Sequence, residues 1–389
     1  MNRLQETRKA PMRLISWMGS NWGIALTGIA IGGFGALLSS FSGSKNTGFC
    51  TTGFLGDLIL AIFPSQNTHA CFCSLQKEAG VQALLPADFI RPEYLGLVLG
   101  PFIASITFRE FHARAGSSTI IRFILGMCGL LGILAFWACP VRTLLRLGGG
   151  DLSALIGLAG LTGGIGIGTI MIRAGFELGK PKDSPLALGL MMPVVMLGLL
   201  TWVIFARSDN PLPRAPLGLA LGAGLTVGFL AQRSRFCIMS SIRNVFLMRS
   251  WVPLLAVGSV VASALVVNAF LGQVQWGFTG QPFAHSNIFW GVLGMVVGGL
   301  AFTLAGACPT RQLFLSGEGN IDSVVFMLGM LTATWIAQQL GFTVAPDTVI
   351  LDNVFVGGPN MAGMIAVIIS LLVCLIIGIS MRKPRSTSG

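Results

Sequence analysis

Ten mainly apolar runs, most of them close to 20 residues long, divide this chain between residues 22 and 380. They lie at 22–42, 94–108, 120–140, 151–172, 185–206, 215–232, 251–272, 287–307, 321–340 and 361–380. A helix needs about 20 apolar residues to cross a bilayer, so we expect ten membrane spans, of which 94–108 is the shortest. Charged residues make up 10% of the chain and the mean hydropathy is +0.79. These values argue against a soluble globular fold, and we expect the lipid bilayer, but no nucleic acid, as a partner.

The charges between the runs predict an orientation. Lys and Arg gather in 1–21, 109–122, 233–249 and 381–389, whereas 273–286 contains neither and 341–360 has only Asp347 and Asp352. Cytoplasmic loops carry the positive excess in membrane proteins. We therefore expect a cytoplasmic N-terminal segment at 1–21, a basic cytoplasmic tail at 381–389 and multi-pass insertion in the cell (inner) membrane. If 94–108 is not a span, the N-terminus moves to the other side.

The chain contains an internal repeat. The segment that starts at Gly129 aligns without gaps with the segment that starts at Gly298, an offset of 169 residues, so Cys139-Pro140 matches Cys308-Pro309. A weaker pair is Phe-Cys at Cys50 and at Cys237. We therefore expect an all-α membrane protein with two homologous halves, 22–206 and 215–380. Five spans per half would invert the second half relative to the first, as in many secondary transporters; a parallel duplication is the open alternative.

Short apolar pieces follow both Phe-Cys pairs, and a proline follows both Ala-Cys pairs. Pieces of this length are typical of re-entrant segments, and proline interrupts a helix. Irregular backbone at membrane depth is tolerated where protein or a water-filled cavity surrounds it. We therefore predict four short re-entrant helices that converge on a central pathway, each with a cysteine at its tip.

The repeated residues are the candidate site. The predicted pathway residues are Cys50, Cys139, Cys237 and Cys308, and the predicted anion-attracting residues are Arg142, Arg235, Arg243 and Arg311. A thiol is a weak donor and a soft acceptor, so it can bind a sulfur- or selenium-bearing ion without holding it too tightly to leave. Duplication of core residues and topological anchoring of arginines at helix ends are the structural alternatives.

The other cysteines carry weaker signals. Cys128 and Cys374 lie inside apolar runs, where a free cysteine commonly acts as a small buried hydrophobe. Cys71 and Cys73 lie in a polar loop near His69, where they could form an outward-facing disulfide, contact a metal or have no role. We expect no metal and no cofactor. Asp57 is the clearest carboxylate at membrane depth.

These motifs resemble those of a known family. The stretch Arg235-Phe236-Cys237 to Arg243, the stretch Leu304 to Cys308 with the following Ser316 to Asn320, and the first-half copy around Cys139 resemble the YeeE/YedE inner-membrane transporters, the YedE branch most closely. The resemblance covers most of the chain and implies an hourglass-shaped bundle with short inner helices. It implies a line of pore cysteines, here Cys139, Cys237 and Cys308, that passes thiosulfate or a selenium species, with Cys50 added by repeat symmetry. A small sulfur-carrier protein of the TusA/SirA-like type is the implied candidate partner.

The residues and the resemblance together predict a non-enzymatic transporter that imports a thiosulfate-like anion or a selenium compound through a cysteine-lined pathway. The main rival is a membrane thiol oxidoreductase, which needs a close cysteine pair that cycles between dithiol and disulfide. The sequence contains no Cys-x-x-Cys, and Cys71 and Cys73 are its one pair of neighbouring cysteines. A structural or assembly protein is the third possibility, and it would not need the duplicated cysteines.

Overall fold

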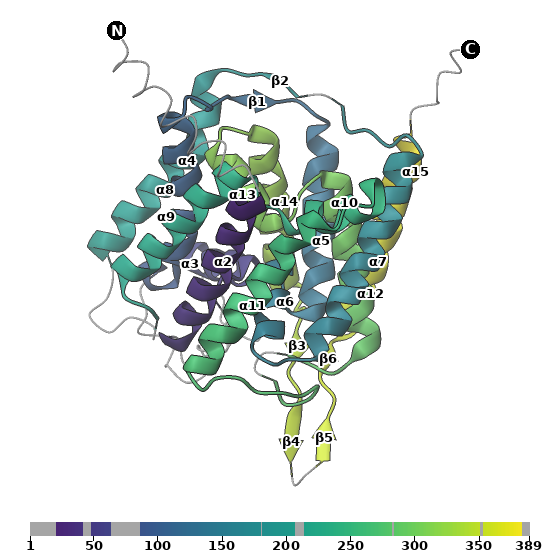
Figure 1. Ribbon diagram of the computed structural model, residues 1–389. Coiled ribbons are helices and arrows are strands. Elements are labelled where there is room, and N and C mark those ends of the chain that lie inside the picture. Colours follow the sequence, from purple (N-terminus) through teal and green to yellow (C-terminus); the bar gives the residue numbers. More distant parts are fainter. Residues whose placement is uncertain are drawn as a thin grey trace.

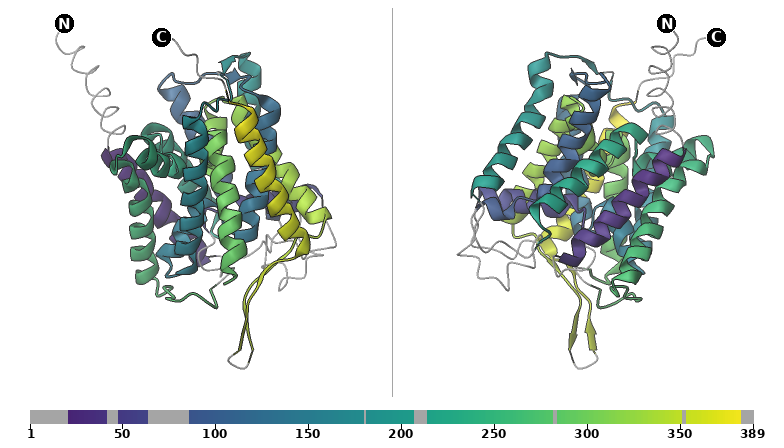
Figure 2. Two further views of the ribbon diagram at one scale, coloured as in Figure 1. Left: turned by 90° about the vertical axis from the view of Figure 1, so that its right-hand side faces the viewer. Right: turned by 60° about the vertical axis from the view of Figure 1, so that its left-hand side comes forward.

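The protein is a helical bundle in the computed structural model, which describes residues 21–41, 48–63, 86–179, 181–206, 214–281, 284–350 and 353–382 (Figures 1 and 2). The helices of the first half are α2 (Asn21–Phe41), α3 (Thr51–Ile62), α4 (Pro92–Thr107), α5 (Thr119–Phe136), α6 (Pro140–Gly148), α7 (Ser153–Arg173) and α8 (Leu186–Ala206). Those of the second half are α9 (Leu217–Ser234), α10 (Ile238–Met248), α11 (Leu255–Phe270), α12 (Ile288–Ala305), α13 (Pro309–Gly317), α14 (Ile321–Gln339) and α15 (Met361–Ser380). The predicted all-α class is confirmed.

Short strands lie at the two ends of the bundle. At one end β1 (Arg114–Ala115) pairs antiparallel with β2 (Lys182–Asp183). At the other end β3 (Val344–Ala345) pairs with β6 (Gly358–Pro359), and β4 (Thr348–Ile350) pairs with β5 (Asn353–Phe355) in a hairpin that projects from the bundle (Figure 1). The basic loop 109–122 and the loop 341–360 therefore lie at opposite ends, which is the separation that the positive-inside rule requires.

Each of the ten predicted spans contains a long helix, α2, α4, α5, α7, α8, α9, α11, α12, α14 or α15. Within the described residues, eight helical segments are long and apolar enough to cross a membrane. The other two helices are α4, which has 16 residues, and α9, which ends in Gln232, Arg233 and Ser234. The multi-pass membrane protein is confirmed, while the count of ten spans and the side of the N-terminus stay predictions.

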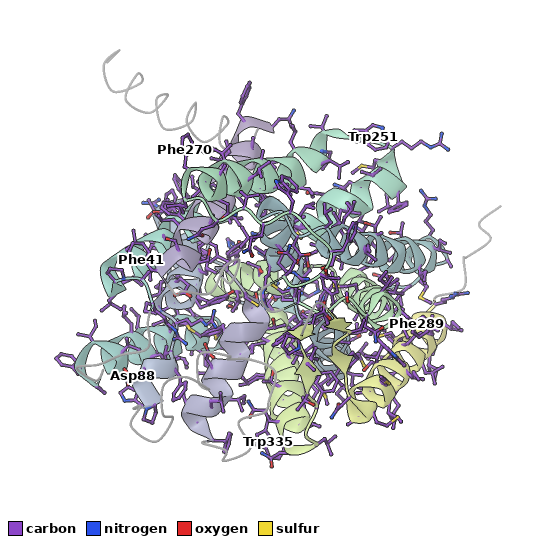
Figure 3. All side chains as sticks on the ribbon, turned by 90° about the horizontal axis from the view of Figure 1, so that it is seen from below. Phe41, Asp88, Trp251, Phe270, Phe289 and Trp335 are labelled. Atoms are coloured by element: carbon purple, nitrogen blue, oxygen red, sulfur yellow. The ribbon has the colours of Figure 1, made fainter. Side chains whose placement is uncertain are left out.

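The outer surface of the bundle is apolar. Trp251, Phe270 and Phe289 lie at the rim when the bundle is seen along its axis (Figure 3), and Phe270 is 88% exposed. Large exposed apolar patches on a soluble protein are rare, but lipid tails cover such a surface in a bilayer. The location in a membrane therefore explains why so many large apolar side chains face outward.

Corresponding helices recur at the offset of the sequence repeat. Residues 119–136 and 140–148 of α5 and α6 become 288–305 and 309–317 of α12 and α13, a shift of 169 residues at all four bounds. α7 ends at the end of the bundle that carries β2, whereas α14 ends at the opposite end, which carries β3 (Figure 1). Corresponding helices that run in opposite senses are what inverted repeats require; the duplication and the division at 22–206 and 215–380 stay predictions.

The two halves interleave through glycine-lined contacts. α4 packs on α9, and α2 packs on α11. A Cβ added at Gly224 of α9 would collide with the backbone carbonyl of Glu93 in α4, and one added at Gly32 of α2 would collide with the backbone carbonyl of Val260 in α11. Small residues let membrane helices approach this closely. The α4–α9 and α2–α11 contacts share this glycine-lined arrangement, and together they hold the short helices in place between the halves.

This packing predicts that Gly224→Ala destabilises the protein by about 1–3 kcal/mol, because the added methyl group forces the two backbones apart. Gly222, two residues earlier in the same helix, is the matched control, since a Cβ there has no atom within 4 Å. Gly222→Ala should leave stability unchanged or raise it slightly. Thermal unfolding of both variants in detergent measures the difference, and equal midpoints would contradict the close approach of α4 and α9.

Candidate functional site

Each of the four predicted pathway cysteines is the N-cap of a short helix. Cys50 precedes α3, Cys139 precedes α6, Cys237 precedes α10 and Cys308 precedes α13. All four are buried, with relative exposures of 0–6%. The prediction that a cysteine sits at the tip of each short segment therefore describes the local geometry correctly.

The sequence explains why the chain breaks before these cysteines. Pro140 and Pro309 open α6 and α13 at the first helical position, where proline is tolerated because its missing N–H would lack a partner there anyway. Before Cys139, Cys237 and Cys308, the preceding helix ends two residues earlier in the left-handed conformation, at Trp137 with φ 62°, at Arg235 with φ 52° and at Gly306 with φ 94°. These turns aim a new helix N-terminus into the bundle.

The thiols meet in two pairs. Cys50 is a neighbour of Cys139, and Cys237 is a neighbour of Cys308, while the Cys139 thiol donates to the Phe49 carbonyl oxygen at 3.9 Å. Further contacts support them, since the Cys50 Sγ lies 3.0 Å from the Thr52 Oγ1 and accepts the Gly53 N–H at 3.4 Å. Each pair joins two short helices of one half, so repeated residues far apart in sequence form one contact.

A threonine bridge connects the two pairs. The hydroxyl of Thr51, next to Cys50, lies 3.1 Å from that of Thr310, two residues after Cys308. Cys139 and Cys308 also interact electrostatically. The four thiols and two hydroxyls thus form a buried row that crosses the interface between the halves.

The helix N-termini supply positive potential along this row. The first N–H groups of a helix lack intrahelical partners, and the helix dipole adds about half a positive charge, so an N-terminus favours an anion. Here α3, α6, α10 and α13 point their N-termini at the thiols they cap. Broken helices that face an anionic substrate in this way are a recurring feature of transporters.

The four predicted arginines differ in what they contact. Arg142 is buried, and its Nη1 lies 3.9 Å from the Cys50 Sγ and 2.8 Å from the Trp137 carbonyl oxygen. Arg311 donates its backbone N–H to the Cys308 Sγ at 3.4 Å, but its guanidinium pairs with Glu318 at 3.3 Å. Arg235 is exposed at the end of α9, and Arg243 is half-buried in α10. Arg142 and Arg311 thus adjoin a predicted pathway thiol, whereas among the described residues neither Arg235 nor Arg243 has a hydrogen bond to one.

An ion-pair cluster that the sequence did not predict lies beside Cys50. Asp57 of α3 is buried and accepts hydrogen bonds from the Arg91 Nε at 2.6 Å and from the Arg214 Nη2 at 3.0 Å. Arg91 also acts electrostatically on Cys50. Asp88, a second buried acid, lies at the same cluster, and its carbonyl oxygen accepts from the Arg214 Nη1 at 3.1 Å. Asp57 is therefore bound in an ion pair. In the sequence, Asp57 itself, an isolated acid at membrane depth, was the one indication of this cluster.

A second buried ion pair lies in the first half. The Arg146 Nε donates to the Asp151 Oδ2 at 2.7 Å, and both side chains are 1% exposed. The Arg146 guanidinium also covers the ring of Phe136 at 4.6 Å from its centroid. The equivalent positions of the second half hold Leu315 and Asn320, so this pair is not part of the repeat and sequence comparison of the halves did not reveal it.

Tyr94 was also missed. It is fully buried, stacks on Phe54 with ring centroids 4.5 Å apart, and places its hydroxyl beside Thr51 without a well-formed hydrogen bond. It interacts electrostatically with Cys50 and Cys139. In the sequence, the one indication of this site was a tyrosine within the shortest predicted span. In the structure this tyrosine lies beside the first thiol pair.

The remaining cysteines divide into two groups. Cys128 of α5 and Cys374 of α15 are buried as predicted, and they are neighbours, with Ser370 beside Cys128. Cys71, Cys73 and His69 lie outside the described residues. Within the part of the chain that the structure describes, no group of three His, Cys, Asp or Glu residues could hold a metal ion.

Comparison with known proteins gives one family match and several relatives. Residues 233–388 match the model of the family described as "Sulphur transport". The chain is 26% identical over 200 residues to the "Probable transporter YedE" of Escherichia coli (strain K12), covering 49% of this chain and 46% of that protein, and equally so to its Salmonella typhimurium counterpart. It is 27% identical over 125 residues to the Escherichia coli "Thiosulfate transporter TsuA", covering 31% of this chain and 34% of that protein.

The chain thus spans less than half the length of the curated relatives it matches. These matches confirm the resemblance to the YeeE/YedE family that the cysteine and arginine motifs indicated. They point to transport rather than to catalysis. Together with the apolar helices, they support a multi-pass protein of a bacterial inner membrane.

Proposed function

We propose that this YedE-family transporter imports a small sulfur- or selenium-containing anion of the thiosulfate type along the row Cys50, Cys139, Cys237 and Cys308. The observation that carries the proposal is that each of these buried cysteines caps a short helix whose N-terminus faces the row. Positive helix ends select an anion, and soft thiols select sulfur or selenium over oxygen. The family match to sulphur transport supports the same class of substrate.

The arrangement suits passage of the anion from one thiol pair to the next. Arg142 and Arg91 add positive charge around Cys50, while Arg311 shares its charge with Glu318 near Cys308. Several weak sites in series allow an anion both to enter and to leave. The Thr51–Thr310 hydroxyl pair, 3.1 Å apart, would receive the anion at the interface of the halves.

Transport through this row requires a conformational step. The four thiols are at most 6% exposed, so neither end of the row is open to water. Relative movement of the two halves around a fixed midplane site is the usual means of alternating access. The glycine-lined contacts of α4 with α9 and of α2 with α11 are the surfaces on which the halves would slide.

A soluble carrier that receives the sulfur would dock at the basic end. This end carries Arg114 of β1 and Lys182 of β2, and the positive-inside rule assigns it to the cytoplasm. We propose a TusA/SirA-like sulfur carrier as the partner there, because a negatively charged carrier surface would be attracted to it.

A membrane thiol oxidoreductase is the second candidate function, and one observation favours it. The thiols of Cys50 and Cys139, and those of Cys237 and Cys308, are already neighbours, although neither pair is close in sequence. Such pairs could cycle between dithiol and disulfide. Trapping the thiols with and without substrate distinguishes the two: substrate-dependent disulfides favour the oxidoreductase.

The direct test is uptake of radiolabelled thiosulfate and of labelled selenosulfate, its analogue with a terminal selenium, by proteoliposomes that contain the purified protein. We expect time-dependent accumulation of label that exceeds protein-free vesicles by at least about tenfold, since a facilitated path replaces the large cost of moving a charge across hydrocarbon. Competition of the unlabelled selenium compound with labelled thiosulfate decides whether one pathway carries both anions. Accumulation no greater than in empty vesicles would contradict the transport proposal.

A further inference from the structure

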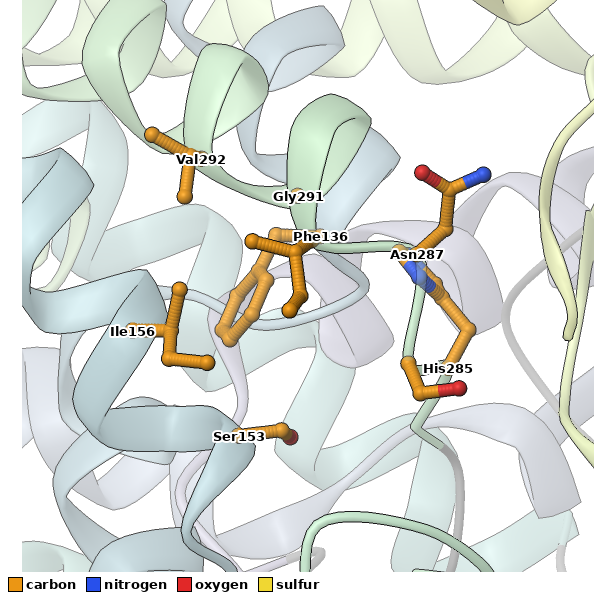
Figure 4. Close-up of a pocket in the computed structure, with 9 residues that line it drawn as sticks. Phe136, Ser153, Ile156, His285, Asn287, Gly291 and Val292 are labelled. Atoms are coloured by element: carbon orange, nitrogen blue, oxygen red, sulfur yellow. The ribbon is translucent and has the colours of Figure 1, made fainter.

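A small cavity lies at the end of the bundle opposite to β1 and β2, between the end of α5 and the starts of α7 and α12. Its lining includes Phe136, Ser153, Ile156, His285, Asn287 and Gly291 (Figure 4). The space for the centre of a water molecule is about 10 Å³, which is room for one water. The acid-only loop 341–360 packs at this end, so the positive-inside rule assigns the cavity to the outer side.

His285 presents an unused acceptor at this cavity. Its side chain is buried, and its Nε2 lies 2.6 Å from the carbonyl oxygen of Ala135. Because a carbonyl oxygen can only accept, Nε2 carries the hydrogen and Nδ1 of the neutral ring is an acceptor. Nδ1 has no hydrogen-bond partner among the described residues, and neither has the Ser286 Oγ beside it. A buried histidine with a free ring nitrogen next to a water-sized space is placed to bind a proton.

The charges around His285 connect it with the thiol row. His285 and Arg146 of α6 donate to neighbouring carbonyl oxygens, His285 to that of Ala135 and Arg146 to that of Phe136 at 3.4 Å. The next carbonyl oxygen, that of Trp137, accepts from Arg142, whose Nη1 lies 3.9 Å from the Cys50 Sγ. The Nη2 of Arg146 donates to the Oγ of Ser153, which lines the cavity, and its charge is balanced by Asp151. On the other side Asp347 accepts the Ser286 N–H at 2.9 Å and acts electrostatically on His285.

We propose that His285 is a proton-binding site at the outer end, whose protonation at Nδ1 strengthens binding of the anion that enters toward Cys50 and Cys139. The proton comes from hydronium in the cavity and leaves neutral water behind. The inference rests on the proposed function and names a regulation of the same pathway.

The energetics give the direction of the effect. Burial, together with the charge of Arg146, holds the pKa of His285 below its ordinary value, so the ring is neutral at neutral pH when no anion is bound. An entering anion favours the imidazolium and raises that pKa. Linkage is reciprocal, so protonation must raise anion affinity by the same factor, and acid outside must promote loading.

The first test measures the KM of labelled thiosulfate uptake into proteoliposomes at external pH values between about 5 and 8. In the wild type we expect KM to fall about fivefold or more toward low pH, with little change in the maximal rate. His285→Gln keeps a donor for Ala135 but cannot titrate, so its KM should stay at the high-pH value throughout. His112→Gln, an exposed histidine on the opposite end, is the control and should behave as wild type.

A wild-type KM that does not change with pH, or an unchanged pH dependence in His285→Gln, would overturn the proposal. Absence of any thiosulfate uptake would instead contradict the proposed function.

A second measurement needs no substitution at His285. With His69 and His112 replaced by glutamine, His285 is the one histidine left in the chain, and NMR of its labelled ring gives its pKa. We expect this pKa to rise when thiosulfate is added, and an unchanged value would overturn the inference.

Discussion

Replacing any one of Cys50, Cys139, Cys237 and Cys308 with alanine is expected to lower thiosulfate uptake about 10- to 100-fold. A hydrogen bond to a charged group contributes about 1.5–3 kcal/mol, and a binding step along the row loses that contribution when its thiol is removed. All four thiols are needed in series, so each single variant should be strongly impaired. Initial rates of labelled uptake in proteoliposomes, at equal amounts of inserted protein, measure the effect.

The chain offers matched controls for this series. Cys128 and Cys374 are buried neighbours, as the proposed pathway thiols are within their pairs, but they lie within the long helices α5 and α15. Alanine at either position should leave the uptake rate within about twofold of wild type, since a truncation away from the row removes no binding step. Normal uptake in all four pathway variants would refute the thiol row, and equal losses in the controls would attribute the effect to folding.

Asp151→Asn is expected to destabilise the protein by about 3–5 kcal/mol, because it leaves the buried guanidinium of Arg146 without its carboxylate. The amide keeps an oxygen that can accept from the backbone of Ser153, whose N–H now donates to the Asp151 Oδ1 at 2.9 Å. Loss of this hydrogen bond to the Ser153 N–H is therefore excluded as the cause. Thermal unfolding in detergent should show a much lower midpoint than in the wild type.

The second half of the chain indicates which second substitution should compensate for the loss of the Asp151 carboxylate. Its equivalent positions are Leu315 and Asn320, so the double variant Arg146→Leu and Asp151→Asn copies a combination that the protein already uses. Removing both charges restores most of the lost stability, since an apolar replacement of a buried ion pair is often neutral. A double variant no more stable than Asp151→Asn would show that the ion pair is not the reason for the loss.

Much of the fold followed from local patterns. Apolar runs located the long helices because hydropathy and length are properties of contiguous residues, and Cys-Pro located the starts of α6 and α13 because proline acts on its own turn. The exact number of membrane spans could not be predicted from these patterns, since α4 is short and α9 ends in polar residues. Their burial between neighbouring helices depends on contacts that no local pattern encodes.

The site was predicted in its residues but not in its contacts. The repeat singled out Cys50 and Cys139, yet the fold makes neighbours of these residues, which lie 89 positions apart in the sequence. The absence of Cys-x-x-Cys therefore gave a misleading picture of thiol pairing. Asp57 was visible as an isolated acid, whereas Arg91 and Arg214, which bind it, lie 34 and 157 residues away. Pairings of this kind are set by tertiary packing.

The most direct test of the thiol row is discrimination between thiosulfate and sulfate. Both are tetrahedral dianions, and they differ in one atom, because a terminal sulfur replaces an oxygen. Helix N-termini and arginines alone would bind them alike, whereas soft thiols favour the sulfur. Initial rates for the two labelled ions in proteoliposomes should show rapid thiosulfate uptake and sulfate uptake at the level of empty vesicles. Equal uptake of the two ions by the wild type would contradict a pathway that recognises sulfur through its cysteines.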